Sequence, residues 1–275
     1  MRRKNSGGLG FGRRFGGDIA AVYHAGRAGD HAVGQDFFAD EYRMNAAIAE
    51  YPKPYVVIMN GITMGGGVGI SAHGSHRIVT DSTKVGMPET GIGLFPDVGG
   101  TYLLARAPGE LGTHLALTGT AVGPGAAIAL GLVDHYVPED DIADLITDLE
   151  SGGDVETVIA RYAAEPPESE LAEAAAWIDE CYRGDDAEAI VAALAAHASP
   201  EANAAAELIL TKAPTSVKVT LAAIRLRHAG ERQLDVLAAS FPRGLAAGGA
   251  GDGVAHGRSP RSDGVDGSSW MLRRA

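Results

Sequence analysis

Three consecutive glycines, Gly65-Gly66-Gly67, lie between an apolar segment, "PYVVIMNGITM", and the short segment "VGISA", which has helical character. Glycine lacks a Cβ, so the backbone can turn sharply there and another group can approach it closely. The first N–H groups of a helix have no acceptor within the helix. The run therefore predicts a strand–turn–helix unit. Its first helical N–H groups either bind an oxyanion or lie in a tight packing turn.

Short strands and short helices alternate around this run, which is typical of an α/β domain. The apolar run "PYVVIMNG" does not alternate with polar residues, so we expect a strand that is covered on both faces. Helices are predicted before it in "DIAAVYHAG" and "VGQDFFADEYRMNAAIAEY". A strand pair, a helix, two short helices and a strand are predicted after it, in "HRIVTDSTKVGMPE", "DVGGTYLLARAPG" and "ELGTHLALTGTAVGPGAAIALGLVDHYVP" in turn.

After Pro138 the composition shifts to alanine with acidic residues, and the apolar spacing becomes that of helices. We expect helices over 139–149, 154–164, 168–182, 185–197 and 200–211, followed by one in "APTSVKVTLAAIRL". The ends are rich in Gly, Ser and Arg and lack large apolar residues. The expected organisation is a poorly ordered start (1–17), a core (18–138), an acidic helical region (139–241) and a disordered tail (242–275).

The net charge of −12 is concentrated in residues 139–201, which hold 18 acidic and 2 basic side chains. Such a surface repels a phosphate backbone, so we expect no nucleic-acid partner. No apolar run is long enough to span a bilayer, and no apolar segment follows the basic start, so we expect neither a membrane protein nor a secreted one. The single cysteine excludes an intrachain disulfide and cysteine metal clusters, and the expected location is the cytoplasm.

Two acids stand eight positions apart in "MPETGIGLFPDVGG", a stretch otherwise made of Gly, Pro, Thr and apolar residues. Burial raises the pKa of a carboxylate, and a second acid nearby raises it further, which suits general acid–base work. Glu89 and Asp97 are therefore candidate catalytic residues. The structural alternatives are that Asp97 caps the helix that follows it and that Glu89 pairs with an arginine.

Three other patterns allow different chemistry but are weaker. Residues 67–72 fit the dinucleotide fingerprint G-x-G-x-x-A, although the acid expected about twenty residues later is in a turn. Ser71 only approaches a nucleophile elbow, because His73 replaces its last glycine. His73 and His76 are three residues apart without a third ligand, so we expect solvated or capping histidines and no metal.

Residues 53–138, from "KPYVVIMNGITMGGGVGISAHG" through "VGMPETGIGLFPDVGGTYLLARAPG" to "LGLVDHYVP", resemble the crotonase (enoyl-CoA hydratase/isomerase) superfamily, and most closely its 3-hydroxyisobutyryl-CoA hydrolase branch. The similarity extends from "GGDIAAVYHAGR" to "APTSVKVTLAAIR". It implies an α/β fold with a ββα spiral core and a helical C-terminal region. Only "MRRKNSGGLGFGRRF" stands where the family has further strands, so an N-terminally truncated core is expected.

The resemblance also implies roles for particular residues. Gly66 matches one backbone donor of an oxyanion hole, and Phe15 stands at the position of the other. Glu41, Glu89 and Asp97 match acidic residues that line the substrate pocket. The family assembles into trimers or related oligomers, and its substrates are acyl-CoA thioesters, so CoA is part of the substrate and no cofactor or metal is expected.

Within the superfamily, similar hydratases carry a second catalytic glutamate where this chain has Gly69, and a glycine where it has Asp97. The resemblance therefore favours thioester hydrolysis, with 3-hydroxyisobutyryl-CoA in valine breakdown as the expected substrate. In this scheme Glu89 attacks the thioester carbonyl or activates water, Asp97 orients the substrate hydroxyl or assists proton transfer, and the Gly66 N–H stabilises the oxyanion. The alternatives are an enoyl-CoA hydratase or isomerase, a truncated inactive subunit, and a dinucleotide-binding oxidoreductase.

Overall fold

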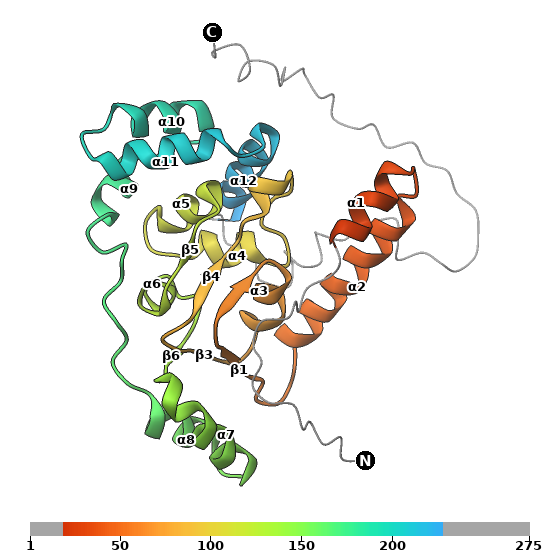
Figure 1. Cartoon of the computed structure of the whole chain (residues 1–275), viewed down its shortest axis with the longest axis vertical. Helices are drawn as coiled ribbons and strands as arrows, with labels where there is room; N and C mark the ends of the chain where they lie inside the picture. Colours follow the sequence, from red (N-terminus) through yellow and green to blue (C-terminus); the bar gives the residue numbers. More distant parts are fainter. Residues whose placement is uncertain (1–18, 228–275) are drawn as a thin grey trace.

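The computed structural model describes residues 19–227, and both expected disordered segments, with the start of the chain and Phe15, lie outside these residues. Helices and short strands follow one another along the described chain (Figure 1). In chain order they are α1 (Ile19–Arg27), α2 (Ala32–Ala49), β1 (Val56–Met59), β2 (Ile62–Met64), α3 (Gly66–Ser71), β3 (His76–Val79), β4 (Lys84–Gly86), η1 (Glu89–Ile92), α4 (Gly100–Ala105), α5 (Leu111–Thr118), β5 (Ala121–Val122), α6 (Pro124–Ala129), β6 (His135–Tyr136), η2 (Glu139–Asp141), α7 (Ile142–Glu150), α8 (Val155–Tyr162), α9 (Ala175–Cys181), α10 (Ala187–Ala196), α11 (Pro200–Leu210) and α12 (Pro214–Arg227).

The described strands form two three-stranded sheets, and the chain passes repeatedly from one to the other. The first sheet has the order β1-β3-β6 with all strands parallel, and the second has the order β2-β4-β5 with β5 antiparallel. Each of the pairs β1–β2 and β3–β4 places one strand in each sheet. A glycine with φ of 89°, Gly61, makes the first of these turns. Two strands followed by a helix thus form the winding unit of a spiral.

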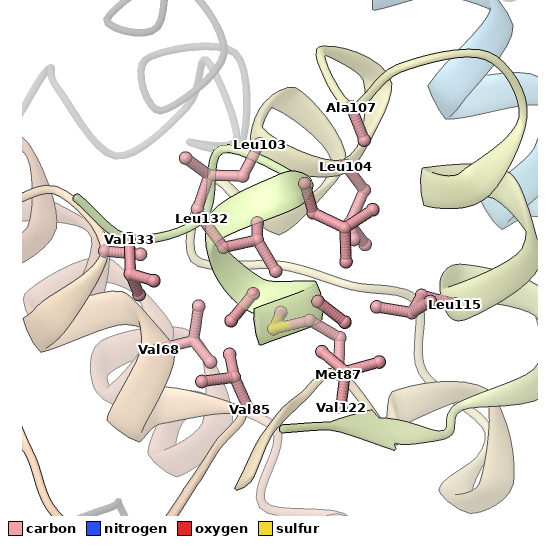
Figure 2. Close-up of a cluster of buried hydrophobic side chains, with 14 of the residues drawn as sticks. Val68, Val85, Met87, Leu103, Leu104, Ala107, Leu115, Val122, Leu132 and Val133 are labelled. Carbon is pink, nitrogen blue, oxygen red and sulfur yellow. The ribbon is translucent and has the colours of Figure 1, made fainter. Parts of the chain in front are cut away.

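The main core fills the space between the two sheets and the helices wound around them. Side chains from α3, β4, α4, α5, β5 and the segment after α6 converge there (Figure 2). They include Val68, Val85, Met87, Leu103, Leu104, Leu115, Val122, Leu132 and Val133. This packing holds the N-terminus of α3 and the start of η1 in place, because both are anchored by residues of this cluster.

The first sheet is covered on both faces, as the unbroken apolar run of β1 predicts. In β3, Val79 packs into the main core, whereas the neighbouring Ile78 packs with residues of α7 and α8. In β1, Val57 lies against the main core, and Val56 and Ile58 lie against the α7–α8 cluster. Successive strand residues point to opposite faces, so the two faces bury two separate clusters.

The helices after residue 138 lie at two opposite ends of the core (Figure 1). The pair α7–α8 packs under the first sheet, while α9 to α12 form a third cluster with Leu117 of α5. Three of these helices begin with a side-chain cap, as acidic and serine residues at these positions favour. Asp154, Asp186 and Ser199 accept backbone N–H groups of the first turns of α8, α10 and α11.

The predicted helices and longer strands are present, and the differences involve short elements. The strands β2 and β5 were not predicted, because three and two residues are too few to show a pattern. The helix expected over 168–182 begins only at Ala175. Residues before it are held by other contacts, since Glu170 accepts the Gly123 N–H at 2.5 Å and Ser169 accepts the Leu171 N–H at 3.2 Å. No helix within residues 19–227 is long and apolar enough to cross a membrane.

Candidate active site

The glycine run opens a helix as predicted, but the strand directly before it is the unpredicted β2, which follows the predicted strand β1. Strand β2 ends at Met64, Gly65 has φ of 54° and ψ of −122°, and α3 begins at Gly66. A side chain at Gly65 would be strained by the positive φ, and its Cβ would lie 3.1 Å from Oε1 of Glu89. The Gly66 N–H, at the first position of α3, has no acceptor within the helix. A backbone donor and a carboxylate are thus brought to the same turn.

Glu89 is the first residue of η1 and is buried, with 5% of its surface exposed. Its Oε2 atom has no hydrogen-bond partner within the described part of the chain. The interpretation of Glu89 as the partner of an arginine is therefore wrong for residues 19–227. Burial with no basic partner raises the cost of ionising this carboxylate, which distinguishes it from a structural ion pair.

Asp97 lies in the loop before α4 and is half-buried. Its Oδ2 atom accepts a hydrogen bond of 2.8 Å from the hydroxyl of Tyr42 on α2. The helix that follows is capped by Gly99 without a side-chain hydrogen bond, so the alternative role of Asp97 as a helix cap is wrong. The side chain instead faces α2, 55 residues earlier in the chain.

Three carboxylic acids share this region, and the charge of Asp97 raises the pKa of the other two. Burial, opposed by a hydrogen bond from its own backbone and reinforced by Asp97 and Glu41, raises the pKa of Glu89 to about 8. Burial, with the charge of Asp97, raises the pKa of Glu41 on α2 to about 7. Burial also raises the pKa of Asp97, while the Tyr42 hydrogen bond opposes this rise. Glu41 and Glu89 therefore bind and release protons near neutral pH, which ordinary surface carboxylates do not do.

Gly69, on α3, is packed so closely against Asn45 on α2 and against Val98 that it has no room for a side chain. A Cβ on Gly69 would lie 2.8 Å from Nδ2 of Asn45 and 2.8 Å from Cβ of Val98. Val98 itself has φ of 45°, a strained value for a β-branched residue. Its carbonyl accepts a 2.6 Å hydrogen bond from Nε2 of buried His73. Because burial lowers the pKa of His73, this histidine is neutral and carries its proton on Nε2.

The competing motifs do not form the sites that their patterns suggest. Ser71 is the last residue of α3, and not at a strand-to-helix elbow. His73 is buried against Val98, which contradicts the expectation that it is solvated. His76 contacts Ser75 at 2.9 Å and Glu156 at 3.1 Å, so the two histidines have separate partners. Among the described residues, no group of three or more His, Cys, Asp or Glu side chains is arranged to hold a metal ion.

Of the residues singled out from the sequence, the structure brings together Gly66, Glu41, Glu89 and Asp97, while Phe15 lies outside the described residues. Sequence reasoning missed Tyr42 and Asn45, although both follow Glu41 on the same helix. Asn45 follows Tyr42 by three residues and Glu41 by four, so it lies on the same side of α2 as each of them, and this was the available signal.

Comparison with known proteins gives a consistent result. A family model described as enoyl-CoA hydratase/isomerase matches residues 11–242. The chain is 43% identical over 215 residues to the mitochondrial 3-hydroxyisobutyryl-CoA hydrolase of Xenopus tropicalis, and 38% identical over 232 residues to 3-hydroxyisobutyryl-CoA hydrolase 1 of Arabidopsis thaliana. These matches cover 74% and 78% of this chain but only 56% and 61% of the two relatives.

Two solved structures resemble the whole described fold. A carnitinyl-CoA dehydratase from Mycobacterium thermoresistibile has a TM-score of 0.78 and 52% identity, covering 82% of this chain and 67% of that one. An enoyl-CoA hydratase from Rhodobacter sphaeroides has a TM-score of 0.75 and 44% identity, covering 80% and 64% of the two chains. The expectation of a crotonase-type α/β fold is thereby confirmed.

Proposed function

The chain belongs to the enoyl-CoA hydratase/isomerase family, and from this premise we propose that it hydrolyses a short β-hydroxyacyl-CoA thioester. The preferred substrate is 3-hydroxyisobutyryl-CoA, which would be split into 3-hydroxyisobutyrate and CoA in valine degradation. The proposal is supported above all by one observation, the buried Glu89 beside the glycine turn, whose Oε2 atom has no hydrogen-bond partner among the described residues. The names of the Xenopus and Arabidopsis relatives point to the same reaction.

In this mechanism Glu89 reacts as a carboxylate. It can attack the thioester carbonyl, which breaks the C–S bond and gives a mixed acyl anhydride and the CoA thiolate; water then attacks the acyl carbonyl of the anhydride, releasing the acid and the Glu89 carboxylate. Alternatively it removes a proton from water as the water attacks the thioester carbonyl, and this proton passes to the departing CoA thiolate. In both routes the C–S bond breaks and water supplies the new carboxyl oxygen. The Gly66 N–H donates to the oxygen of the tetrahedral intermediate, and Phe15 stands at the position of a second backbone donor.

The other two acids act on the acyl group and on protons. Asp97 orients the substrate hydroxyl or assists proton transfer, and Glu41 lines the same pocket beside it. Each step uses the protein's own carboxyl and backbone groups, so the scheme needs no metal and no cofactor beyond the CoA of the substrate. The proposed partners are an acyl-CoA substrate, which the scheme requires, and copies of the same chain in a trimer-type assembly, which the family resemblance implies; neither nucleic acid nor a membrane is proposed as a partner.

A second candidate function is hydration or dehydration at the acyl double bond, as the names of the two solved structures suggest. That chemistry in similar hydratases uses a glutamate at the position of Gly69. A side chain there would meet Asn45 and Val98 at 2.8 Å. Because this close packing leaves no room for the second acid, hydrolysis is favoured over hydration.

A third candidate is an inactive subunit that binds CoA compounds without converting them. CoA binding without turnover, measured by calorimetry, would support this alternative. The cytoplasm is the proposed location, and cell fractionation tests it against the mitochondrial location in the name of the Xenopus relative.

The deciding experiment follows thiol release from 3-hydroxyisobutyryl-CoA at pH 8, where about half of Glu89 is ionised. Glu89→Gln keeps the shape of the side chain but removes the carboxylate, so we expect kcat to fall by roughly 10³-fold. Glu150→Gln, an exposed change at the end of α7, is the control and should leave the rate unchanged. Hydration of crotonyl-CoA by the wild type, without thiol release, would contradict the proposal.

A further inference from the structure

Tyr42 is placed on α2 so that its hydroxyl reaches only one oxygen of Asp97. The ring is buried, with 8% exposed, and it stacks on Phe38 of the same helix with 5.9 Å between ring centroids. Its hydroxyl donates to Oδ2 of Asp97 at 2.8 Å. Packing holds the Tyr42 ring in one position, and this sets the position of its hydroxyl. The hydrogen bond from that hydroxyl therefore favours one orientation of the Asp97 carboxylate.

The surroundings of Asp97 show why this donor matters. The groups facing it are the acids Glu41 on α2 and Glu89 on η1, and neither attracts its negative charge. His73, on the segment after α3, donates from Nε2 to the carbonyl of the neighbouring residue Val98. Tyr42 is therefore the side chain that donates to Asp97 among like charges, beside a hydrogen bond from the backbone of Asp97 itself. The phenol of Tyr42 donates this hydrogen bond without bringing a positive charge. The negative charge of Asp97 is therefore not neutralised by an ion pair and can act on a ligand.

We propose that Tyr42 is a positioning residue that holds Asp97 by Oδ2 and so presents its other oxygen to the hydroxyl of the acyl group. This inference rests on the proposed function, because it assigns selectivity for hydroxylated acyl groups to the pair Tyr42–Asp97. Tyr42 itself does not need to touch the substrate. Its hydrogen bond also favours the ionised form of Asp97 against the burial that disfavours it.

The first test compares two substrates that differ only in the hydroxyl, 3-hydroxyisobutyryl-CoA and isobutyryl-CoA. In Tyr42→Phe, we expect the ratio of the two kcat/KM values to fall about tenfold, because a misoriented carboxylate loses its hydrogen bond to the hydroxyl. The ratio of kcat/KM for the two substrates does not depend on the fraction of folded enzyme, because both values are measured with the same preparation. Tyr136→Phe is the matched control, since Tyr136 is equally buried and donates to Asp81 at 2.6 Å outside the site.

The second test needs no activity and therefore separates this inference from the proposed function. Protein labelled with ¹³C at the aspartate carboxyl is titrated by NMR, and Asp97→Asn identifies the Asp97 signal. Tyr42→Phe should move its midpoint up by about one pH unit, whereas Tyr136→Phe should not move it. If wild-type protein releases no thiol, the proposed function fails, and the titration still decides the role of Tyr42.

Two results would overturn the inference. One is a midpoint that stays in place in folded Tyr42→Phe, and the other is an unchanged substrate ratio. If Tyr42→Phe does not fold, Asp97→Asn gives the second measurement, because it should lower the substrate ratio by at least as much. Where all variants fold, Tyr42→Phe should have no further effect on the ratio in the Asp97→Asn background.

Discussion

At the scale of single residues, Glu89 is a buried carboxylic acid whose ionisation is costly in the folded protein. Burial and the neighbouring acids raise its pKa from the ordinary 4.5 to about 8. The folded protein thus keeps this proton up to about pH 8, whereas the unfolded chain releases it near pH 4.5. Since the unfolded state binds fewer protons in between, the free energy of unfolding contributed by Glu89 falls as the pH rises through this window.

Glu89→Gln should therefore stabilise the protein while removing its activity. The amide cannot ionise, so we expect the variant to gain on the order of 3 kcal/mol over the wild type at pH 8 and little near pH 4.5. Urea unfolding at a series of pH values measures this difference. Exposed Glu150→Gln is the control and should follow the wild-type curve. Equal pH dependence in the wild type and Glu89→Gln would contradict this account.

The sequence was sufficient to predict which acids belong to the site but not what they contact. Glu89 and Asp97 stand among apolar and glycine residues, and this composition indicates burial directly. The Tyr42 hydrogen bond joins residues 55 positions apart, and no local pattern encodes such a contact. The capping role considered for Asp97 is wrong for the same reason, because its side chain accepts the hydrogen bond from Tyr42 and does not cap α4.

At the scale of elements, the packing of α3 against α2 decides what the site can contain. Gly69 lies within α3, where alanine would ordinarily stabilise a helix by up to about 1 kcal/mol. Here a Cβ would lie 2.8 Å from both Asn45 and Val98. We therefore expect Gly69→Ala to lower the free energy of unfolding by about 2 kcal/mol, as measured by urea unfolding.

The matched control for this change is Gly26→Ala in α1, where a Cβ would meet no atom within 4 Å. That substitution should leave the stability unchanged or raise it slightly. If both variants were equally stable, α2 would be free to move away from α3. The close contact could then no longer explain why a second acid is missing from the site.

Element prediction from the sequence succeeded where an element is long enough to show its period. The helices α2, α10 and α11 have 18, 10 and 11 residues, and their apolar spacing is readable. The strands β2 and β5 have three and two residues and depend on pairing with β4. Their stability comes from the sheet, so a local pattern cannot predict them.

At the scale of the whole molecule, Arg225 of α12 joins the helical region to the core. Its guanidinium donates to Oε2 of Glu110 at 2.8 Å, just before α5. It also donates to the backbone carbonyls of Tyr182 at 2.7 Å and Gly184 at 3.0 Å, in the loop between α9 and α10. Only 17% of the Arg225 side chain and 18% of the Glu110 side chain are exposed, so water replaces these hydrogen bonds poorly.

Arg225→Met should therefore destabilise the protein by about 3 kcal/mol, because it keeps the aliphatic stem but removes the positive partner of a half-buried carboxylate, to which the Thr113 hydroxyl still donates, and the guanidinium donor of two carbonyls. Urea unfolding measures the loss. Arg161→Met is the control, since Arg161 pairs with Asp148 at 3.2 Å with 56% of its own side chain exposed, and its removal should cost less than about 1 kcal/mol. Equal losses in the two variants would mean that α12 is held to the core by its apolar face alone. That face places Leu221 in the cluster of α9 to α12 and Ile224 in the main core.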